Sequence, residues 1–391
     1  MGLNCSLTDS GQPSSENSEG PNNAWVMEGN PHRAAKLFIQ RALQRCQHME
    51  PLALTLSLLQ SLETRHRDII AFYKRPRVEW ASPLTCRLIG DSAIGDGVKR
   101  HVLSTVMEAL QSGFILDEGQ RRVLLFEGER DHLTPSGSLD LVESDFFVTA
   151  GRMIGDCFLN EGPCLIGLSP AIIHVILGGN PEMATITHAD CVDLDVRDVL
   201  ELLEGTATLT EEQKARVDSI CLPWDLPSVT TENRKWMMEK ILLHTVLGRT
   251  TKQIKQLKKG LKDSGVWDLL SARPDTAMVM FPRTSEAALT PQMILDKITW
   301  PTSNDLDDDV SLEDQCRVLS TPDVLKSLLR FWTGWEVLPS YLEVEVINCG
   351  LPQSSTCFQT LKLPAHIREL GQFSDDLKAV TTTSYSGFGQ I

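Results

Sequence analysis

The segment 351–364 limits what this chain can fold into more than any other stretch. Two prolines bracket it, and the apolar residues of its second half, beginning with Phe358, are spaced to anchor a short extended segment in a small core. Cys357 follows Ser355 and Thr356 where this apolar pattern begins. We therefore expect a cysteine at the mouth of a turn, packed on one side and open to solvent on the other. A reactive thiol needs this setting, because the thiolate is the nucleophile and must be reachable.

The sequence around Cys357 resembles the active-site segment of HECT-type ubiquitin ligases: it reads Leu-Pro-x-x-x-Thr-Cys-Phe-x-x-Leu-x-Leu-Pro. Two further segments resemble the same family, in the family's order. Residues 329–334, Leu-Arg-Phe-Trp-Thr-Gly, with Val-Leu-Pro at 337–339, are similar to the opening of its C-terminal lobe, and Gly-Phe-Gly-Gln-Ile at 387–391 is similar to its tail. Residues 253–267 resemble HECT-like sequences related to the G2/M-phase-specific ubiquitin ligase, whose ligase domain is also compact.

This resemblance implies an α+β, bilobal domain with a mainly helical N-lobe and a small α/β C-lobe. Within it, residues 182–232 would form a reduced subdomain for binding the ubiquitin-conjugating enzyme (E2). The residues before this domain are assigned from their own composition and spacing: a polar stretch with few apolar residues predicts a disordered tail, and helical spacing predicts an arm. The expected boundaries are 1–30 for the tail, 31–75 for the arm, 76–310 for the N-lobe and 311–391 for the C-lobe.

The resemblance also implies site residues and partners. Cys357 would carry ubiquitin as a thioester before transfer to a substrate lysine, and Phe388 would pack into the N-lobe to fix the transfer geometry. Ser355 and Thr356 have hydroxyl groups that are able to stabilise the oxyanion. The implied partners are ubiquitin, an E2 and a substrate protein that the sequence does not identify, with no cofactor and no metal.

Three positions depart from the family pattern. Arg100 matches a family arginine, but His101 stands where the family usually has glutamate, so we expect a missing or rewired ion pair there. Ser355 replaces a frequent histidine, and Gln359 replaces a usual asparagine.

Apolar spacing predicts several individual elements. Between 34 and 69 it indicates two helices divided by Pro51. Strands are expected at 84–89 and 341–347. Helices are expected through 102–110, 190–203, 324–331 and 367–380, with another starting at Thr210. A helix at 146–155 is implied instead by the resemblance of this segment to a helix of the HECT family.

Charge and cysteine content restrict the class of protein. The net charge of −15 argues against a nucleic-acid partner. Ten cysteines in 391 residues are too few for a disulfide scaffold, which indicates a cytoplasmic or nuclear protein. The first six residues fit a myristoylation pattern at Gly2 with Cys5 placed for a second acylation, and we expect membrane attachment only if both are acylated.

Two alternatives to an active ligase stay open. The short 182–232 region and His101 fit a degenerate HECT fold that acts as a binding or regulatory module. Cys357 with His366 would instead serve a cysteine hydrolase, although no third catalytic member is identifiable.

Overall fold

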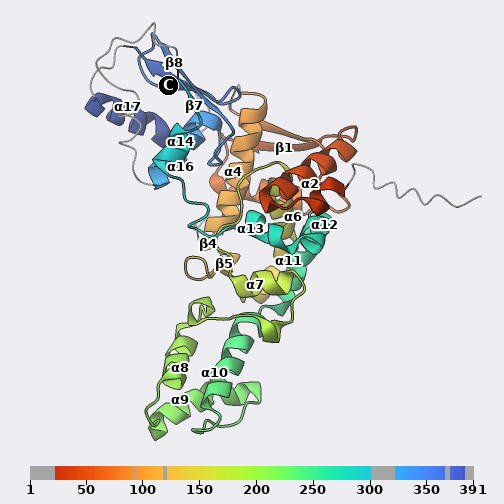
Figure 1. Ribbon diagram of the computed structural model, residues 1–391, viewed down its shortest axis with the longest axis vertical. Helices are drawn as coiled ribbons and strands as arrows, with labels where there is room; N and C mark the ends of the chain where they lie inside the picture. Colours follow the sequence, from red (N-terminus) through yellow and green to blue (C-terminus); the bar gives the residue numbers. More distant parts are fainter. Residues whose placement is uncertain (1–22, 92, 118–120, 301–321, 366–369, 384–391) are drawn as a thin grey trace, which may run out of the picture.

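The computed structural model describes residues 23–91, 93–117, 121–300, 322–365 and 370–383 (Figure 1). Helices combine with several small sheets in an α+β arrangement, as predicted. The buried apolar side chains form three separate cores: a main one, a C-terminal one and a small helical one. In Figure 1 the helical core lies at the opposite end of the molecule from β8 and α17 of the C-terminal core. The predicted sites at Gly2, Cys5, His366 and Phe388 lie outside the described residues.

The main core begins earlier in the chain than expected. Residues 23–30, assigned by the sequence to a disordered tail, include helix α1 (Ala24–Met27), whose buried Trp25 packs edge-on against Phe38 at 5.2 Å between ring centroids. Phe38 lies on helix α2 (Pro31–Cys46), which Asn30 caps by accepting the backbone N–H of Arg33. The tail prediction is therefore wrong for these residues.

The prediction of a second helix in the arm is wrong for the residues directly after Pro51. Residues Leu52–Ser57 form strand β1, and helix α3 begins only at Leu62 and runs to Tyr73. Strand β1 pairs in parallel with β2 (Leu84–Ile89), the predicted strand. Leucines at 52, 54, 56 and 59 satisfy both a helical and an alternating pattern, so periodicity alone does not decide between them. Pairing with β2 buries Leu54 and Leu56, whereas Leu59 is 80% exposed.

Helices α4 (Asp96–Ser112), α6 (Phe146–Leu159) and α11 (Thr251–Asp263) form the centre of the main core. Two glycines let α6 and α11 touch along their backbones: a Cβ on Gly260 would lie 2.1 Å from the Val148 carbonyl oxygen, and one on Gly151 would lie 2.3 Å from that of Leu257. Around these helices lie short elements: α5 (Leu139–Glu143), α7 (Pro170–Ile176), α12 (Trp267–Ala272), α13 (Ala277–Met280), and two hairpins, β3 (Phe114–Ile115) with β4 (Arg122–Val123) and β5 (Phe126–Glu127) with β6 (Thr134–Pro135).

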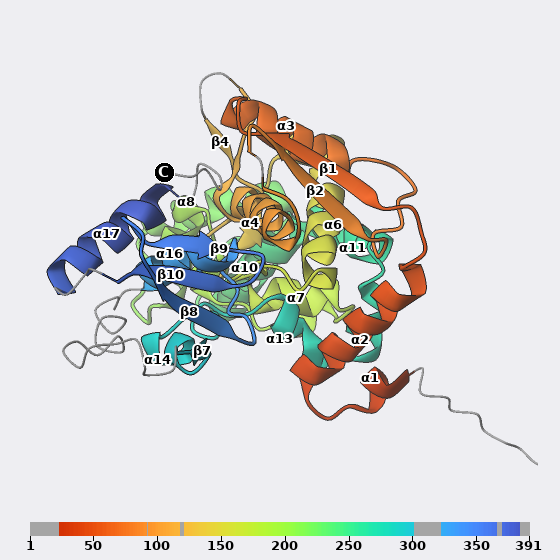
Figure 2. The same ribbon diagram turned by 90° about the horizontal axis from the view of Figure 1, so that it is seen from above.

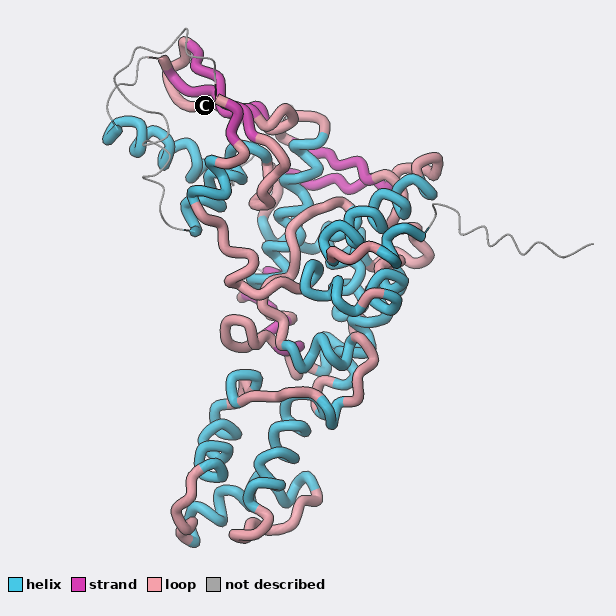
Figure 3. The backbone as a smooth tube through the Cα atoms, viewed as in Figure 1, coloured by secondary structure: helices cyan, strands magenta, loops and turns pink. Residues whose placement is uncertain are grey.

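The small helical core is built by α8 (Leu194–Glu204), α9 (Glu211–Cys221) and α10 (Arg234–Leu243). Figure 3 shows this unit as helices and loops only. Thr210 starts α9 as predicted, in a capping box with Gln213. A single π-helical segment, His244–Gly248, joins α10 to α11 and so connects the helical unit to the main core.

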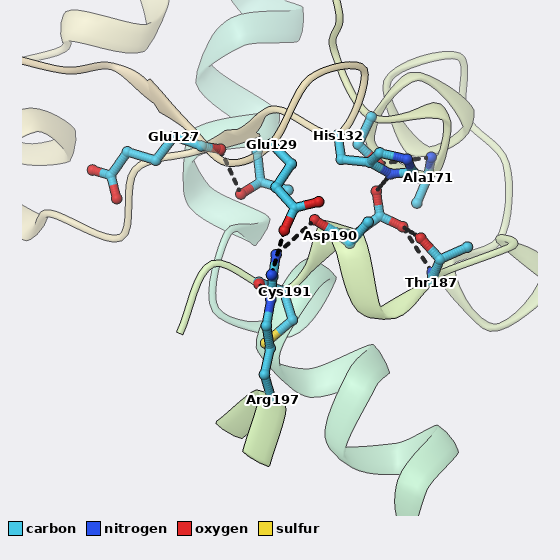
Figure 4. Close-up of polar contacts among 11 residues, drawn as sticks. Glu127, Glu129, His132, Ala171, Thr187, Asp190, Cys191 and Arg197 are labelled. Atoms are coloured by element: carbon cyan, nitrogen blue, oxygen red, sulfur yellow. Dashed lines mark hydrogen bonds and ion pairs between the residues drawn. The ribbon is translucent and has the colours of Figure 1, made fainter. Parts of the chain in front are cut away.

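Asp190 fixes the other connection to the helical unit (Figure 4). This buried carboxylate accepts hydrogen bonds from the backbone N–H and hydroxyl of Thr187, at 2.7 and 2.9 Å, and lies 2.8 Å from Nδ1 of His132. Arg197 on α8 reaches back to Glu129 and to the carbonyl oxygen of Cys191. The helical unit is thus held to the main core by a polar junction as well as by the π-helical segment.

The C-terminal core combines a four-stranded sheet with helices α14 (Pro291–Leu295), α16 (Pro322–Thr333) and α17 (Leu370–Thr383). The strand order is β7 (Ile298–Thr299), β8 (Leu342–Ile347), β10 (Thr360–Pro364) and β9 (Gln353–Ser355). Only the β10–β9 pair is antiparallel. Figure 2 shows this sheet and α16 beside α4 of the main core. Within the described residues, no helix is both long and apolar enough to cross a membrane.

Candidate active site

Cys357 lies in a tight turn between β9 and β10. Ser355 ends β9 opposite Thr360, the first residue of β10, so residues 356–359 make the reversal. The Phe358 N–H donates to the Ser355 carbonyl oxygen at 3.0 Å, and Gln359 adopts a φ of 56°. Asparagine tolerates that left-handed conformation better than most residues, which gives a physical reason for the asparagine implied at this position. The turn presents Cys357 as an exposed residue.

The prediction for the apolar residues around this turn is partly wrong. Leu361 and Leu363 are buried in the C-terminal core, as expected. Phe358 is instead 71% exposed, because it belongs to the turn and not to the strand that follows it. An exposed aromatic ring therefore stands next to the candidate nucleophile.

The thiol of Cys357 lies against the start of α4. Its Sγ donates to the carbonyl oxygen of Ile94 at 3.3 Å. A Cβ added to Gly95 or Gly97 would lie 3.4 Å from Sγ. Because neither residue has a side chain, the sulfur is able to approach the backbone at the start of α4. The first N–H groups of a helix have no acceptor within the helix and carry its positive end. Cys357 therefore lies beside the N-terminus of α4, with its thiol donating to a backbone carbonyl oxygen.

Arg100, one turn further along α4, connects that helix to the cysteine turn. Its Nη1 donates to the carbonyl oxygens of Thr356 at 2.9 Å and Thr333 at 3.4 Å, and its guanidinium stacks 5.5 Å from the Trp335 ring centroid. The Gln359 side chain satisfies both of its neighbours when its oxygen accepts from Nη2 of Arg100 at 3.1 Å and its nitrogen donates to the Tyr341 carbonyl oxygen at 2.8 Å. One arginine thus fixes both ends of the turn.

Close glycine packing completes the contact between the two cores. A Cβ on Gly97 would lie 2.2 Å from Oγ1 and 3.0 Å from Cβ of Thr356. Gly334, with a φ of 91°, approaches the carbonyl oxygen of Gly97 so that a Cβ there would lie 2.8 Å from it. The C-terminal core is therefore docked on α4 at van der Waals distance.

The predicted supporting residues differ in their surroundings. Thr356 is buried and its hydroxyl packs against Gly97, while Ser355 is half-buried in β9. Sequence reasoning did not identify Ile94, Gly95 or Gly97 as neighbours of the cysteine. The only signal for them is the glycine-rich turn that precedes Arg100.

His101 lies in the interior of the main core, close to an ion pair between α4 and α16. His101 is buried, and burial followed by the charge of Arg330 lowers its pKa to about 4, so the ring is neutral at pH 7. Arg330, on α16, pairs with Glu108 of α4 at 2.8 Å and lies 3.7 Å from Glu336. An ion pair between Arg330 and Glu108 therefore joins α16 to α4.

Cys357 differs from the other cysteines that the structure describes. Of the eight, Cys357 is the exposed one, and the others are buried or half-buried. Burial raises the pKa of Cys86 to about 12 and that of Cys164 and Cys221 to about 11, which disfavours their thiolates near pH 7. Across the described ranges, no three His, Cys, Asp or Glu side chains gather in a group that could hold a metal ion.

Comparison with known proteins relates this chain to a family and to a curated relative. The family model described as HECT-domain (ubiquitin-transferase) matches residues 108–390. A G2/M phase-specific E3 ubiquitin-protein ligase from Macaca fascicularis is 26% identical over 215 residues, which cover 54% of this chain. The matched region spans 28% of that relative's length.

Proposed function

Because the chain belongs to the HECT-domain (ubiquitin-transferase) family, we propose that it is an E3 ubiquitin-protein ligase that carries ubiquitin on Cys357. It would accept ubiquitin from an E2 as a thioester and pass it to a lysine of a substrate protein. The observation that carries this proposal is the position of Cys357: an exposed thiol in a tight turn, at the open start of α4.

The chemistry consists of two acyl transfers. In the first, the Cys357 thiolate attacks the carbonyl carbon of the E2–ubiquitin thioester, and the tetrahedral intermediate collapses with release of the E2 thiolate. In the second, a neutral lysine amine attacks the new thioester, loses a proton and expels the Cys357 thiolate. Each step places negative charge on a carbonyl oxygen, so donors near the turn lower the barrier.

The supporting roles belong to the same proposal. The hydroxyl of Ser355 is half-buried beside the turn, and that of Thr356 faces Gly97. We assign oxyanion stabilisation to these two residues and to backbone N–H groups at the start of α4. Phe388 would pack against the N-lobe and fix the geometry of transfer.

The three cores support a bilobal assignment. The main and helical cores would together form the N-lobe, and the C-terminal core with Cys357 would form the C-lobe. This C-lobe would begin before the expected residue 311, because Leu289 and Ile294 belong to the C-terminal core. The helical unit, which includes the predicted 182–232 subdomain, would bind the E2. It lies at the opposite end of the molecule from the C-terminal core in Figure 1, so transfer requires one of these units to move.

The proposal is tested by incubating the purified protein with E1, ubiquitin and a broad panel of E2 enzymes. An active ligase forms a ubiquitin adduct that reductant removes, and Cys357→Ala abolishes the adduct. Cys349→Ala is the matched control, because this half-buried cysteine lies just before β9 in the same core. If no E2 gives an adduct but ubiquitin still binds, and binds equally to Cys357→Ala, the chain is a binding module and not a ligase.

A further inference from the structure

A polar cavity of about 240 Å³ lies where α16 of the C-terminal core meets α3, α4 and β4 of the main core. Cys357 and Arg100 do not line it, so it is separate from the candidate active site. Its charged and titratable lining side chains are Arg65, His66, His101, Glu108, Arg122 and Arg330. Residues from four elements, distant in sequence, therefore converge on one small space.

The cavity carries an excess of positive charge. Three arginines line it against one lining carboxylate, that of Glu108, which pairs with Arg330. Glu336 also lies 3.7 Å from Arg330 but is not part of the lining, so Arg65 and Arg122 carry the excess charge. His66 and His101 add no charge near pH 7. Burial, followed by the neighbouring arginines, lowers the pKa of each to about 4, with Arg65 acting on both.

Several donors in the cavity remain for a ligand. His66 accepts the Ile115 N–H on Nδ1 at 2.8 Å, so its ring proton is on Nε2. Arg65 has a buried Nε with no acceptor among the described residues. Arg122 is exposed, and its Nη1 donates to Ser112 and Gly113. No described residue accepts a hydrogen bond from its Nε or Nη2, so these two groups are able to contact a ligand. A buried donor such as Nε of Arg65 normally finds an acceptor.

We propose that this cavity binds a small tetrahedral anion of the phosphate type. Guanidinium groups match the planar, multi-oxygen face of a phosphoryl group and bind it through charge-assisted hydrogen bonds. The volume lies below the range of about 300–1,000 Å³ typical of sites for drug-sized ligands, which favours an ion or a single phosphoryl group over a larger molecule. The phosphoryl group comes either from free phosphate or from a small phosphomonoester.

A bound anion would also join the two cores. Arg330 belongs to α16 of the C-terminal core, whereas Arg65 and Arg122 belong to α3 and β4 of the main core. An anion that contacts all three stabilises the docked arrangement by mass action. This inference concerns binding and docking, so it stands or falls independently of ubiquitin transfer.

The test is isothermal titration calorimetry of the full chain at constant ionic strength, with inorganic phosphate, O-phosphoserine and chloride as probes. We expect saturable one-site binding of at least one of the two phosphoryl compounds and none of chloride. Tighter binding of phosphate identifies the free ion as the source, and tighter binding of O-phosphoserine identifies a phosphomonoester. Arg65→Gln and Arg122→Gln should each weaken binding at least about tenfold, since each removes a charge-assisted contact.

Two further variants separate loss of the binding site from a general effect of mutation. Arg67→Gln is the matched control: Arg67 also lies on α3 but is 62% exposed, pairs with Glu63 and does not line the cavity, so binding should be unchanged. Glu108→Gln removes the competing carboxylate and should tighten phosphate binding. Because a gain in affinity does not result from misfolding, this variant tests the site even if an arginine variant fails to fold. Absence of saturable binding, equal binding of chloride, or equal losses in Arg67→Gln and Arg65→Gln would overturn the proposal.

Discussion

Arg100 donates a hydrogen bond to the carbonyl oxygen of Thr356 at 2.9 Å, across 256 positions of sequence. Thr356 directly precedes Cys357, so a side chain on α4 determines where the candidate nucleophile sits. The same guanidinium donates to the carbonyl oxygen of Thr333, the last residue of α16, and stacks on Trp335, two residues later. Arg100 of the main core therefore contributes several of the contacts that dock the C-terminal core.

Arg100→Ala should loosen this docking and expose Cys357 further. A hydrogen bond to a charged group contributes about 1.5–3 kcal/mol, so its loss should raise the undocked population about tenfold or more. We expect faster alkylation of Cys357 by iodoacetamide, measured by mass spectrometry of its peptide. Arg100→Lys should be intermediate, because an ammonium cannot reproduce the two-sided contact. Arg67→Ala, at an exposed site on α3, should leave the rate unchanged. An unchanged alkylation rate in Arg100→Ala would show that the contacts of Arg100 do not hold the cysteine turn against α4.

Gly97→Ala should separate the cores by steric contact. The new methyl group would lie 2.2 Å from Oγ1 of Thr356, and rotation of the threonine does not help because its Cβ is also only 3.0 Å away. Alkylation of Cys357 should again accelerate, while α4 itself gains up to about 1 kcal/mol of helix propensity. Gly137→Ala is the control, since a Cβ there meets nothing within 4 Å. A similar rate in both variants would contradict close docking.

Gly260→Ala should destabilise the main core. A Cβ at this position would lie 2.1 Å from the Val148 carbonyl oxygen and 2.7 Å from Cα of Gly151, and both atoms belong to the backbone of α6. The helices must move apart, at a cost of about 1–3 kcal/mol that exceeds the gain of about 1 kcal/mol in helix propensity. Urea denaturation should show a lower free energy of unfolding. A stabilised variant would mean that α6 and α11 do not touch along their backbones.

Asp156→Asn should change how stability depends on pH. Asp156 is fully buried on α6, accepts a hydrogen bond from the Tyr73 hydroxyl at 2.6 Å, and has its pKa raised by burial from 3.8 to about 7. Between these values the folded chain keeps a proton that the unfolded chain has lost, so the contribution of Asp156 to stability falls as pH rises. The total fall is about 4 kcal/mol at most.

The difference between variant and wild type isolates this effect. His66 and His101, whose pKa values burial lowers to about 4, give the opposite slope, because the unfolded chain protonates them below about pH 6.5. Both proteins contain these histidines, so subtraction removes them. The free energy of unfolding of Asp156→Asn minus that of wild type should rise from pH 4.5 to pH 7.5 and then level off. A flat difference would show that Asp156 is ionised in the folded chain across this range.

Local sequence pattern predicts some parts of this molecule well. The burial of Leu361 and Leu363, the strands at β2 and β8 and the capped start of α9 follow from patterns of a few residues. The same reasoning fails at β1, where leucine spacing fits two periods and the pairing with β2 decides. It fails at Phe358 because a turn residue has no partner side chain to bury it.

Contacts between distant segments are what sequence pattern does not reveal. Cys357 is recognisable from its neighbours, but the start of α4 that faces it is 260 or so positions earlier. The arginines of the anion cavity come from α3, β4 and α16 and form no local motif. Only the folded chain brings them together.

Single-turnover transfer from a preformed E2–ubiquitin thioester tests the central claim most directly. The unreduced product is digested and analysed by mass spectrometry for the residue that carries the ubiquitin C-terminus. We predict attachment to the Cys357 sulfur, and a reductant-resistant ester at the same position in Cys357→Ser. Attachment at another residue, or equal transfer to Cys357→Ala, would contradict the account.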